Sequence, residues 1–420
     1  MEADSPRIAA DSRARIWLLA LTIAGAFLRL LWLGRKSFWL DEGVSYLMAT
    51  SQGRPHDSFW AYQALYHELL RLWIRLGDSE FMIRLFSVIP GVATIPVIYL
   101  LGRRLFNRRI GLYAALLLTV HVSLIQYSQE ARSYALVVFL CSVATLFFVR
   151  AVEHDAPGDW VLYFLFSALA IYAHLLSALV IPAQFLSVLI LPSRSVPWRR
   201  LAPCAIALAA VAAPPALIIL RGGAGGTEFI GSASYLQLPK VIAMLAGDAV
   251  VLPCYLVFWV FAICWLRRTF TGHERCVPAW HAGLLASWCV TPVLLLMLIS
   301  LVKPAFVPRY LLVCAPAAVL LAARGLADLR LRPRMLLLAA TVFLSLGTLF
   351  YRQTRPREDW RGAAQYVFAQ AQAGDAVTIV PPFARLPFAY YQHRFGGDAL
   401  PLETPGATVP SREWTRGLAH

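Results

Sequence analysis

Long apolar runs separated by short polar stretches follow one another from Ile16 to about residue 350. Most are long enough to cross the hydrocarbon core of a bilayer, which takes about 17 to 25 helical residues. The pattern predicts eleven membrane-spanning helices, at residues 16–34, 82–102, 110–128, 132–149, 160–173, 175–191, 201–220, 249–266, 282–302, 309–324 and 335–350. The sequence therefore indicates an all-α polytopic membrane protein.

The short segments 160–173 and 175–191 leave one alternative, a single tilted helix, which would reverse the orientation of everything after it. The basic residues favour two helices, because short cytoplasmic loops collect Lys and Arg. With two helices and a cytoplasmic N-terminus, the stretches GRRLFNRR and PSRSVPWRR both face the cytoplasm. A single helix would export PSRSVPWRR and bring KPAFVPRY inside. We therefore expect the tail after residue 350 to lie outside.

Three regions then face outward: a loop at about 35–81, a loop at about 221–248 and the tail. In the first loop, Leu65, Leu69, Leu72, Trp73 and Leu76 share one helical face, which predicts a helix lying along the membrane interface. The tail contains a helical stretch, DWRGAAQYVFAQAQ, and a strand-like AVTIV. The expected organisation is a transmembrane domain, 1–350, and a small outer α/β appendage, 351–420.

Composition agrees with a bilayer environment. The 420 residues are 59% hydrophobic and only 15% charged, which excludes an ordinary soluble domain. The net charge of +15 comes mostly from Arg and falls largely in the predicted cytoplasmic loops. The expected partners are accordingly membrane lipids, and we expect no nucleic acid partner.

Rare polar residues gather at the outer ends of the predicted helices. Ionisable groups at such depths are costly, so they are candidates for a functional site. The candidate residues are Asp41 and Glu42 in SFWLDEGVSYL, Glu130 and Arg132 in QYSQEARSYAL, His174 in IYAHLLS, and Lys303, Arg309 and Tyr310 in KPAFVPRYLL.

Each of these candidates also has a purely structural interpretation. The two adjacent acids could begin an interfacial helix, since acids favour a helix N-terminus. Glu130 and Arg132 could pair locally in a turn, and His174 could be a packing residue. Lys303 and Arg309 could anchor helix ends among lipid headgroups. Their convergence from separate helices on one side of the membrane favours a site.

The chemistry of this set suits transfer of a group from a lipid phosphate to a hydroxyl. Guanidinium groups bind phosphate in a planar, often bidentate way and stabilise charge on a departing phosphate. A carboxylate can take the proton of an incoming hydroxyl. A second carboxylate and a His could hold a divalent cation such as Mg, Mn or Zn, although no spacing here is diagnostic of a metal site.

At these residues the chain resembles the GT-C glycosyltransferases, in particular the bacterial branch with protein mannosyltransferases, lipid A aminoarabinose transferase and sugar transferases of rhizobial lipopolysaccharide. The resemblance is carried by FWLDE, LLRLWIRLGDSEFMIRLFSVIPG, YSQEARSYAL and VPRYLL, in this order and spacing. IYAHLLS, DWRGAAQYV and AGDAVTIV match more loosely.

The resemblance implies a polyprenyl-phosphate-linked sugar donor, an active site on the outer face and a single displacement with inversion. It implies that Asp41 acts as base with Glu42 beside it, that Glu130 is the second acid and that Arg132 faces the phosphate. In one departure, Tyr62, Gln63 and Ala64 stand where many relatives have His-Pro-Pro. A metal or phosphate contact made there in relatives is in doubt, unless His67 substitutes.

The expected function is transfer of a sugar from a polyprenyl-phosphate carrier to a hydroxyl of a glycolipid, polysaccharide or protein, at the periplasmic face of the inner membrane. The alternative is a transporter or flippase of lipids or lipid-linked sugars. Such transporters typically show internal repeats with broken helices in corresponding positions, and the sequence shows none. An assembly scaffold without chemistry would leave the acids and Arg132 replaceable.

Overall fold

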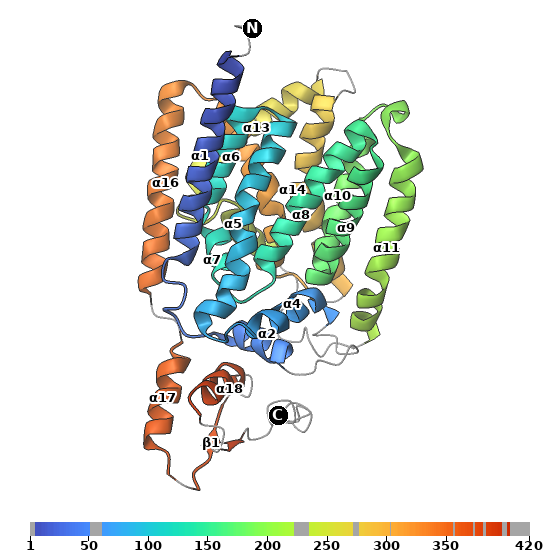
Figure 1. The fold of residues 1–420 in the computed structure, drawn as a ribbon. Helices are drawn as coiled ribbons and strands as arrows, with labels where there is room; N and C mark the ends of the chain where they lie inside the picture. Colours follow the sequence, from blue (N-terminus) through green and yellow to red (C-terminus); the bar gives the residue numbers. More distant parts are fainter. Residues whose placement is uncertain are drawn as a thin grey trace.

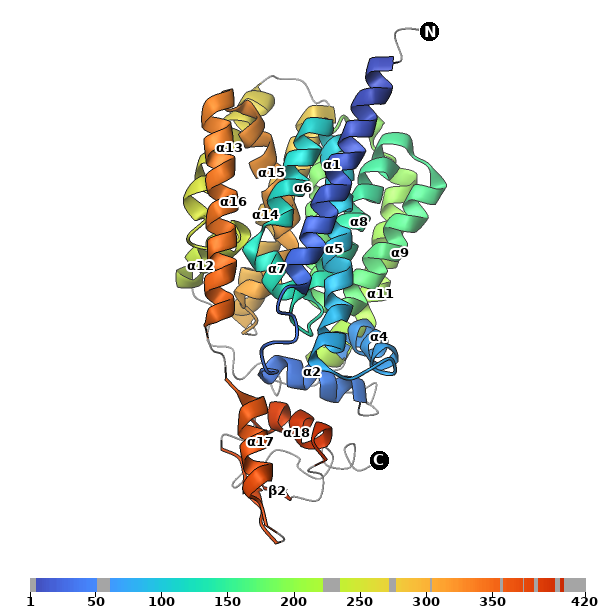
Figure 2. The ribbon, with the colours of Figure 1, turned by 60° about the vertical axis from the view of Figure 1, so that its left-hand side comes forward.

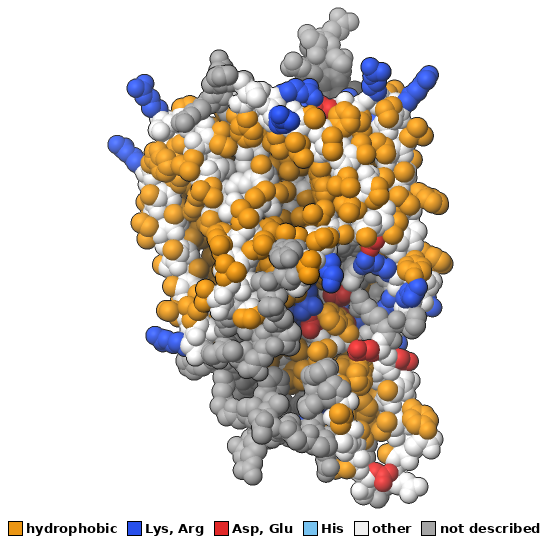
Figure 3. Space-filling model, turned by 180° about the vertical axis from the view of Figure 1, so that it is seen from behind, with side chains coloured by type: hydrophobic (Ala, Val, Ile, Leu, Met, Phe, Trp, Pro, Cys, Tyr) orange, Lys and Arg blue, Asp and Glu red, His pale blue; other side chains and the backbone are white. Residues whose placement is uncertain are grey.

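The computed structural model describes residues 5–50, 61–221, 235–271, 277–302, 304–355, 358–372, 374–380, 384–396 and 401–403. Long helices run side by side in a bundle, with the start of α1 (Ser5–Leu30) at one end and a small C-terminal appendage at the other (Figure 1). Apolar side chains cover the outside of the bundle (Figure 3), as expected where lipid replaces water.

The bundle follows the chain in order. After α1 its helices and 3₁₀ turns are α5 (Glu80–Leu105), α6 (Arg108–Thr119), α7 (Val122–Ser128), α8 (Tyr134–His154), α9 (Pro157–Ala173), η1 (Leu175–Leu179), α10 (Val180–Ser187), η2 (Val188–Ile190), η3 (Ser193–Ser195), α11 (Trp198–Arg221), η4 (Tyr235–Gln237), α12 (Leu238–Leu245), α13 (Leu252–Thr271), α14 (Val277–Val302), η5 (Pro308–Cys314), α15 (Ala315–Asp328) and α16 (Leu331–Thr354).

Each of the eleven predicted segments coincides with helical structure, so the predicted fold class is confirmed. Within the described residues, seven helices are long and apolar enough to cross a membrane. The number becomes eight if α6 and α7, bent by 58° relative to each other, form one broken span. The regions 157–173 and 175–190 form shorter apolar helices.

The break between α6 and α7 was not predicted, because the sequence there contains neither Pro nor Gly. His121 occupies the break, and its Nδ1 accepts a hydrogen bond from the backbone N–H of Leu124 at 3.3 Å, which caps the start of α7. Its Nε2 lies 3.2 Å from the backbone oxygen of Leu245. The interruption thus satisfies backbone groups that would otherwise lie unpaired at depth.

Small residues bring α15 into the centre of the bundle. Its Ala-rich face is almost entirely buried. A Cβ atom on Gly325 would lie 1.8 Å from the backbone oxygen of Phe258 on α13, so only glycine permits this approach. Close backbone packing through small residues is the usual means by which membrane helices associate.

Two helices lie across the end of the bundle nearest the appendage, α2 (Leu40–Thr50) and α4 (Ala64–Ile74), as Figures 1 and 2 show. The predicted interfacial helix corresponds to α4. Of its predicted apolar stripe, Leu72 is 55% exposed and Leu76, just after the helix, is 69% exposed, whereas Leu65 and Trp73 pack against the protein. Tyr66 and His67 of α4 are buried. Leu72 and Leu76 therefore suit contact with lipid.

The appendage consists of α17 (Trp360–Gln370), α18 (Arg385–Arg394) and a parallel pair of two-residue strands, β1 (Val377–Thr378) and β2 (Leu402–Glu403). Helix α18 packs on α2. A Cβ atom on Gly43 would lie 2.9 Å from backbone atoms of Leu386 and Pro387, which shows how closely these helices approach. Glu80 ties the appendage to α5, pairing with Arg361 at 2.8 Å and accepting from Tyr391 at 3.1 Å.

Candidate active site

Asp41, Arg132 and Arg309 meet at the end of the bundle nearest the appendage. Asp41 stands in the first turn of α2, Arg132 in the turn between α7 and α8, and Arg309 in η5. Arg309 Nη2 lies 3.0 Å from Asp41 Oδ2, and Arg132 Nε lies 3.9 Å from the same oxygen. The structure therefore brings together three candidates that are far apart in sequence, and we call them the Asp–Arg cluster.

The turn that carries Arg132 is fixed from several sides. Arg132 Nη1 donates to the backbone oxygen of Asp41 and to Ser45 Oγ, each at 3.2 Å, and its own carbonyl accepts from Ser87 Oγ at 3.1 Å. Burial lowers the pKa of Arg132, but Tyr134 and Asp41 raise it overall, so the side chain stays charged. The guanidinium is thus held in place before any ligand arrives.

The Asp–Arg cluster is not sealed. The side chain of Asp41 is 17% exposed and that of Arg309 is 23% exposed. Among the described residues, Nε of Arg132 and Nε of Arg309 have no hydrogen-bond partner. Both guanidinium groups therefore keep donor capacity for an anionic ligand.

Glu42 points elsewhere and has different neighbours. Its two carboxylate oxygens accept from Nε and Nη2 of Arg84, both at 2.7 Å, and Oε1 also accepts from the backbone N–H of Ala131 at 2.9 Å. The Glu42 side chain is fully buried. Glu42 is thus committed to an internal ion pair that ties α2 to α5 and to the turn carrying Arg132, and it lies beside Asp41 in sequence only.

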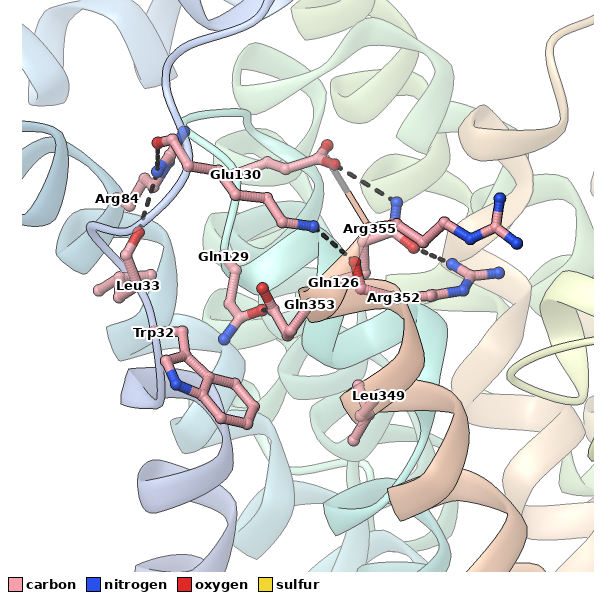
Figure 4. A pocket seen from close by; sticks show the side chains of 11 residues that line it. Trp32, Leu33, Arg84, Gln126, Gln129, Glu130, Leu349, Arg352, Gln353 and Arg355 are labelled. Atoms are coloured by element: carbon pink, nitrogen blue, oxygen red, sulfur yellow. Dashed lines mark hydrogen bonds between the residues drawn. The ribbon is translucent and has the colours of Figure 1, made fainter. Parts of the chain in front are cut away.

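Glu130 lies in a neighbouring cavity of about 280 Å³ (Figure 4). Gln126 donates to Glu130 Oε1 at 3.5 Å and accepts a hydrogen bond from Arg352, which also pairs with Asp248. The lining combines both charge signs with amides and comprises Trp32, Leu33, Lys36, Arg84, Gln126, Gln129, Glu130, Leu349, Arg352, Gln353 and Arg355. Because Glu130 and Arg132 lie two residues apart in the same turn, the cavity lies near the Asp–Arg cluster.

His174 is the centre of a group of aromatic rings. Its ring centroid lies 4.5 Å from that of Tyr62, 5.1 Å from that of Tyr310 and 5.9 Å from that of Tyr134. Tyr62 precedes α4, Tyr134 begins α8, His174 separates α9 from η1, and Tyr310 lies in η5. We call these four residues the Tyr–His cluster.

The Tyr–His cluster borders the Asp–Arg cluster. The guanidinium carbon of Arg132 lies 5.7 Å from the centre of the Tyr134 ring, and that of Arg309 lies 5.9 Å from the centre of the Tyr310 ring. The sequence analysis named His174 and Tyr310 but missed Tyr62 and Tyr134. Only their positions in the sequence could have indicated a role in the site. Tyr62 stands where many relatives have His, and Tyr134 is two residues after Arg132.

Two other candidates complete the set. His67 is buried in α4 close to Arg132, and burial together with the charge of Arg132 lowers its pKa to about 3. Lys303 lies outside the described residues. In the part of the chain that the structure describes, no three His, Cys, Asp or Glu side chains come together as a metal-binding group.

Comparison with known proteins places this geometry in context. Residues 65–219 match the family model of the dolichyl-phosphate-mannose-protein mannosyltransferases. No curated protein matches the sequence significantly.

Two solved structures share most of the architecture. The crystal structure of ArnT from Cupriavidus metallidurans bound to undecaprenyl phosphate has a TM-score of 0.67 and 16% identity, covering 96% of this chain and 87% of that one. The crystal structure of the Archaeoglobus fulgidus oligosaccharyltransferase has a TM-score of 0.59 and 13% identity. The match covers 86% of this chain and 58% of that one. At this identity the likeness shows the fold, which is that of the GT-C glycosyltransferases, as the sequence motifs predicted.

Proposed function

We propose that this protein is a membrane glycosyltransferase that moves a sugar from a polyprenyl-phosphate carrier to an acceptor hydroxyl. The observation that carries the proposal is the meeting of one partly exposed carboxylate, Asp41, with two guanidinium groups, Arg132 and Arg309, at one end of the bundle. The GT-C fold and the match to the mannosyltransferase family model support the reaction class.

In the proposed reaction, Asp41 takes the proton of the acceptor hydroxyl as its oxygen attacks the anomeric carbon of the donor sugar. The new bond forms as the bond between that carbon and the phosphate oxygen breaks. The polyprenyl phosphate leaves with the bonding electrons, and the configuration at the anomeric carbon inverts. Each step uses a group present in the Asp–Arg cluster.

The two arginines have distinct tasks in this scheme. A donor phosphodiester carries one negative charge, and more charge develops on it as the sugar departs. Arg132 is fixed by hydrogen bonds to α2, whereas Arg309 contacts Asp41 through its side chain. We infer that the phosphate binds to both arginines and competes with Asp41 for Arg309, which leaves the carboxylate available to accept a proton.

Glu130 is assigned to the acceptor. A carboxylate repels phosphate but accepts hydrogen bonds from hydroxyl groups. Its cavity lies next to the Asp–Arg cluster and contains three glutamines, Gln126, Gln129 and Gln353, whose amides suit a hydroxyl-rich molecule. Glycolipids, polysaccharides and proteins all present hydroxyl groups of this kind, and Glu130 would orient one of them toward Asp41.

The proposed location is the inner membrane, with the site on the periplasmic side. The start of α1 and the appendage lie at opposite ends of the bundle (Figure 1), which requires an odd number of crossings if the helices span the bilayer. The predicted cytoplasmic loops hold the main Arg clusters. The outer end then holds α2, α4, the Asp–Arg cluster and the appendage.

The test uses the purified protein with a panel of polyprenyl-phosphate sugars, an envelope extract as acceptor, and detection of the released polyprenyl phosphate. Release that depends on a lipid-linked sugar supports the proposal. Robust transfer from a nucleotide sugar without any lipid carrier would contradict it, as would movement of lipid-linked sugar across a vesicle membrane without cleavage.

A further inference from the structure

Several buried polar atoms beside the Asp–Arg cluster have no hydrogen-bond partner among the described residues. They are Gln63 Oε1, both ring nitrogens of His67, His174 Nε2 and Ser177 Oγ. All four side chains belong to residues that are at most 5% exposed. Proteins pair nearly all of their buried polar groups, so such a concentration of unpaired atoms indicates a place where a polar ligand supplies the partners.

These atoms belong to two adjoining segments. Gln63 and His67 follow Tyr62 at the start of α4, and His174 and Ser177 lie at the junction of α9 with η1. The backbone oxygen of Tyr62 accepts a hydrogen bond from the N–H of Leu175 at 3.1 Å, which joins the two segments directly. The unpaired atoms and the rings of the Tyr–His cluster therefore come from the same pair of chain segments.

The position of this region relative to the Asp–Arg cluster matters for the donor. Arg132 and Arg309 each approach a ring of the Tyr–His cluster, Tyr134 and Tyr310 respectively. A phosphate held by the two guanidinium groups would thus have the Tyr–His cluster as a neighbour. The group attached to that phosphate in the donor is the sugar, and aromatic faces with hydrogen-bonding edges suit its apolar ring faces and its hydroxyls.

The region carries no net charge with which to bind an ionised sugar. Burial and the charge of Arg132 lower the pKa of His174, like that of His67, to about 3, so both rings are neutral at physiological pH. Glu42 is paired with Arg84, and Asp41, which the phosphate releases from Arg309, is engaged by the acceptor hydroxyl in the proposed reaction. Glu68 on α4 pairs with Arg71 at 3.3 Å. An ammonium group on the sugar would reach Asp41 only in competition with the acceptor.

We propose that the Tyr–His cluster, with Gln63 and His67, binds the donor sugar and selects an uncharged, hydroxyl-rich sugar over amino sugars and uronic acids. This inference rests on the proposed function and deepens it. Neutral imidazoles both donate and accept hydrogen bonds, as sugar hydroxyls do. A cationic or anionic sugar would lose its hydration in the Tyr–His cluster, while the adjoining ions are engaged by the rest of the reaction, Arg132 and Arg309 by the donor phosphate and Asp41 by the acceptor hydroxyl.

The test measures binding, so it does not require the acceptor. The wild-type protein in detergent is titrated with sugar-free polyprenyl phosphate in the form of its methyl diester, which carries the same single charge as the donor, and with polyprenyl phosphate carrying a neutral hexose, a neutral pentose, a 4-amino sugar or a uronic acid. One or two added hydrogen bonds should tighten binding of a neutral-sugar lipid about tenfold relative to the sugar-free lipid. The charged sugars should give no such gain.

His174→Gln and Tyr62→Phe locate the effect. Both variants should reduce the tenfold gain from the neutral sugar, while affinity for sugar-free polyprenyl phosphate stays at the wild-type value and shows that the protein is folded. Glu68→Gln, on the exposed side of α4, should change neither affinity. Equal or tighter binding of an amino sugar or uronic acid would overturn the sugar selection, whereas absence of binding to every lipid, sugar-free included, would instead contradict the proposed function.

Discussion

Arg309 and Asp41 form an ion pair of 3.0 Å between η5, late in the chain, and the first turn of α2, near its beginning. The contact joins a group suited to holding phosphate with a group suited to accepting a proton. Because both side chains remain partly exposed, a ligand can reach them.

The arginines should act on turnover more than on folding. Removing one preorganised donor to developing charge typically lowers turnover about 10²- to 10³-fold, and we expect losses of that size for Arg132→Ala and for Arg309→Ala. Arg132→Lys should recover part of the loss, because it keeps the charge but not the planar donor set. Turnover of a lipid-linked sugar by purified variants checks this. Arg268→Ala, exposed at the opposite end of the bundle, is the control, and unchanged turnover in Arg132→Ala would exclude a phosphate contact.

Glu42 should prove to be a structural residue. Removing one partner of a buried ion pair costs about 3 to 5 kcal/mol, so Glu42→Gln should lower the thermal stability of the protein substantially. Glu68→Gln breaks the more exposed pair with Arg71 and should cost at most about 1 kcal/mol. The midpoint temperature of thermal unfolding, measured in detergent, distinguishes the two variants. A Glu42→Gln protein of normal stability and no activity would argue for a direct catalytic role instead.

The appendage should support the position of Asp41 through Gly43. In Gly43→Ala the new Cβ atom would lie 2.9 Å from backbone atoms at Leu386 and Pro387, so α18 or α2 must move. We expect faster proteolysis of the appendage, because its contact with α2 is weakened, and a loss of turnover, because Asp41 lies on the same helix turn as Gly43. Gly158→Ala meets no atom within 4 Å and serves as the matched control. Equal proteolysis and activity in both variants would show that α18 does not hold α2.

The proposed arrangement of the spans predicts that the appendage and Arg199 lie on opposite sides of the membrane. A reporter active only in the periplasm should give signal when fused after Gly374 and none when fused near Arg199. The reverse result would invert the topology and place the Asp–Arg cluster in the cytoplasm.

Much of the architecture follows from hydrophobic pattern alone, because a bilayer requires long apolar helices and their length is readable in the sequence. The break at His121 was not predicted, since it depends on a side-chain cap and a contact with Leu245 and not on a helix-breaking residue.

At the site, the sequence indicated that Asp41, Arg132 and Arg309 share one end of the bundle, because each is a polar residue at an outer helix end. The resemblance named Asp41 as the base with Glu42 beside it, but it did not predict that Glu42 forms a buried ion pair. That pair depends on Arg84, which lies inside an apolar run and whose partner is visible only in the fold. The separate cavity of Glu130 and the contacts of Tyr62 likewise depend on the direction of side chains.

The most direct measurement compares turnover and donor binding in Asp41→Asn. Asparagine keeps the size of the side chain but cannot take a proton from the acceptor, so turnover of a polyprenyl-phosphate sugar should fall below detection. Affinity for the donor should remain close to that of the wild type, because the two arginines still bind the phosphate. Asp41→Asn turning over at a rate near that of the wild type would contradict the assignment of Asp41 as the base and, with it, the mechanism proposed for this site.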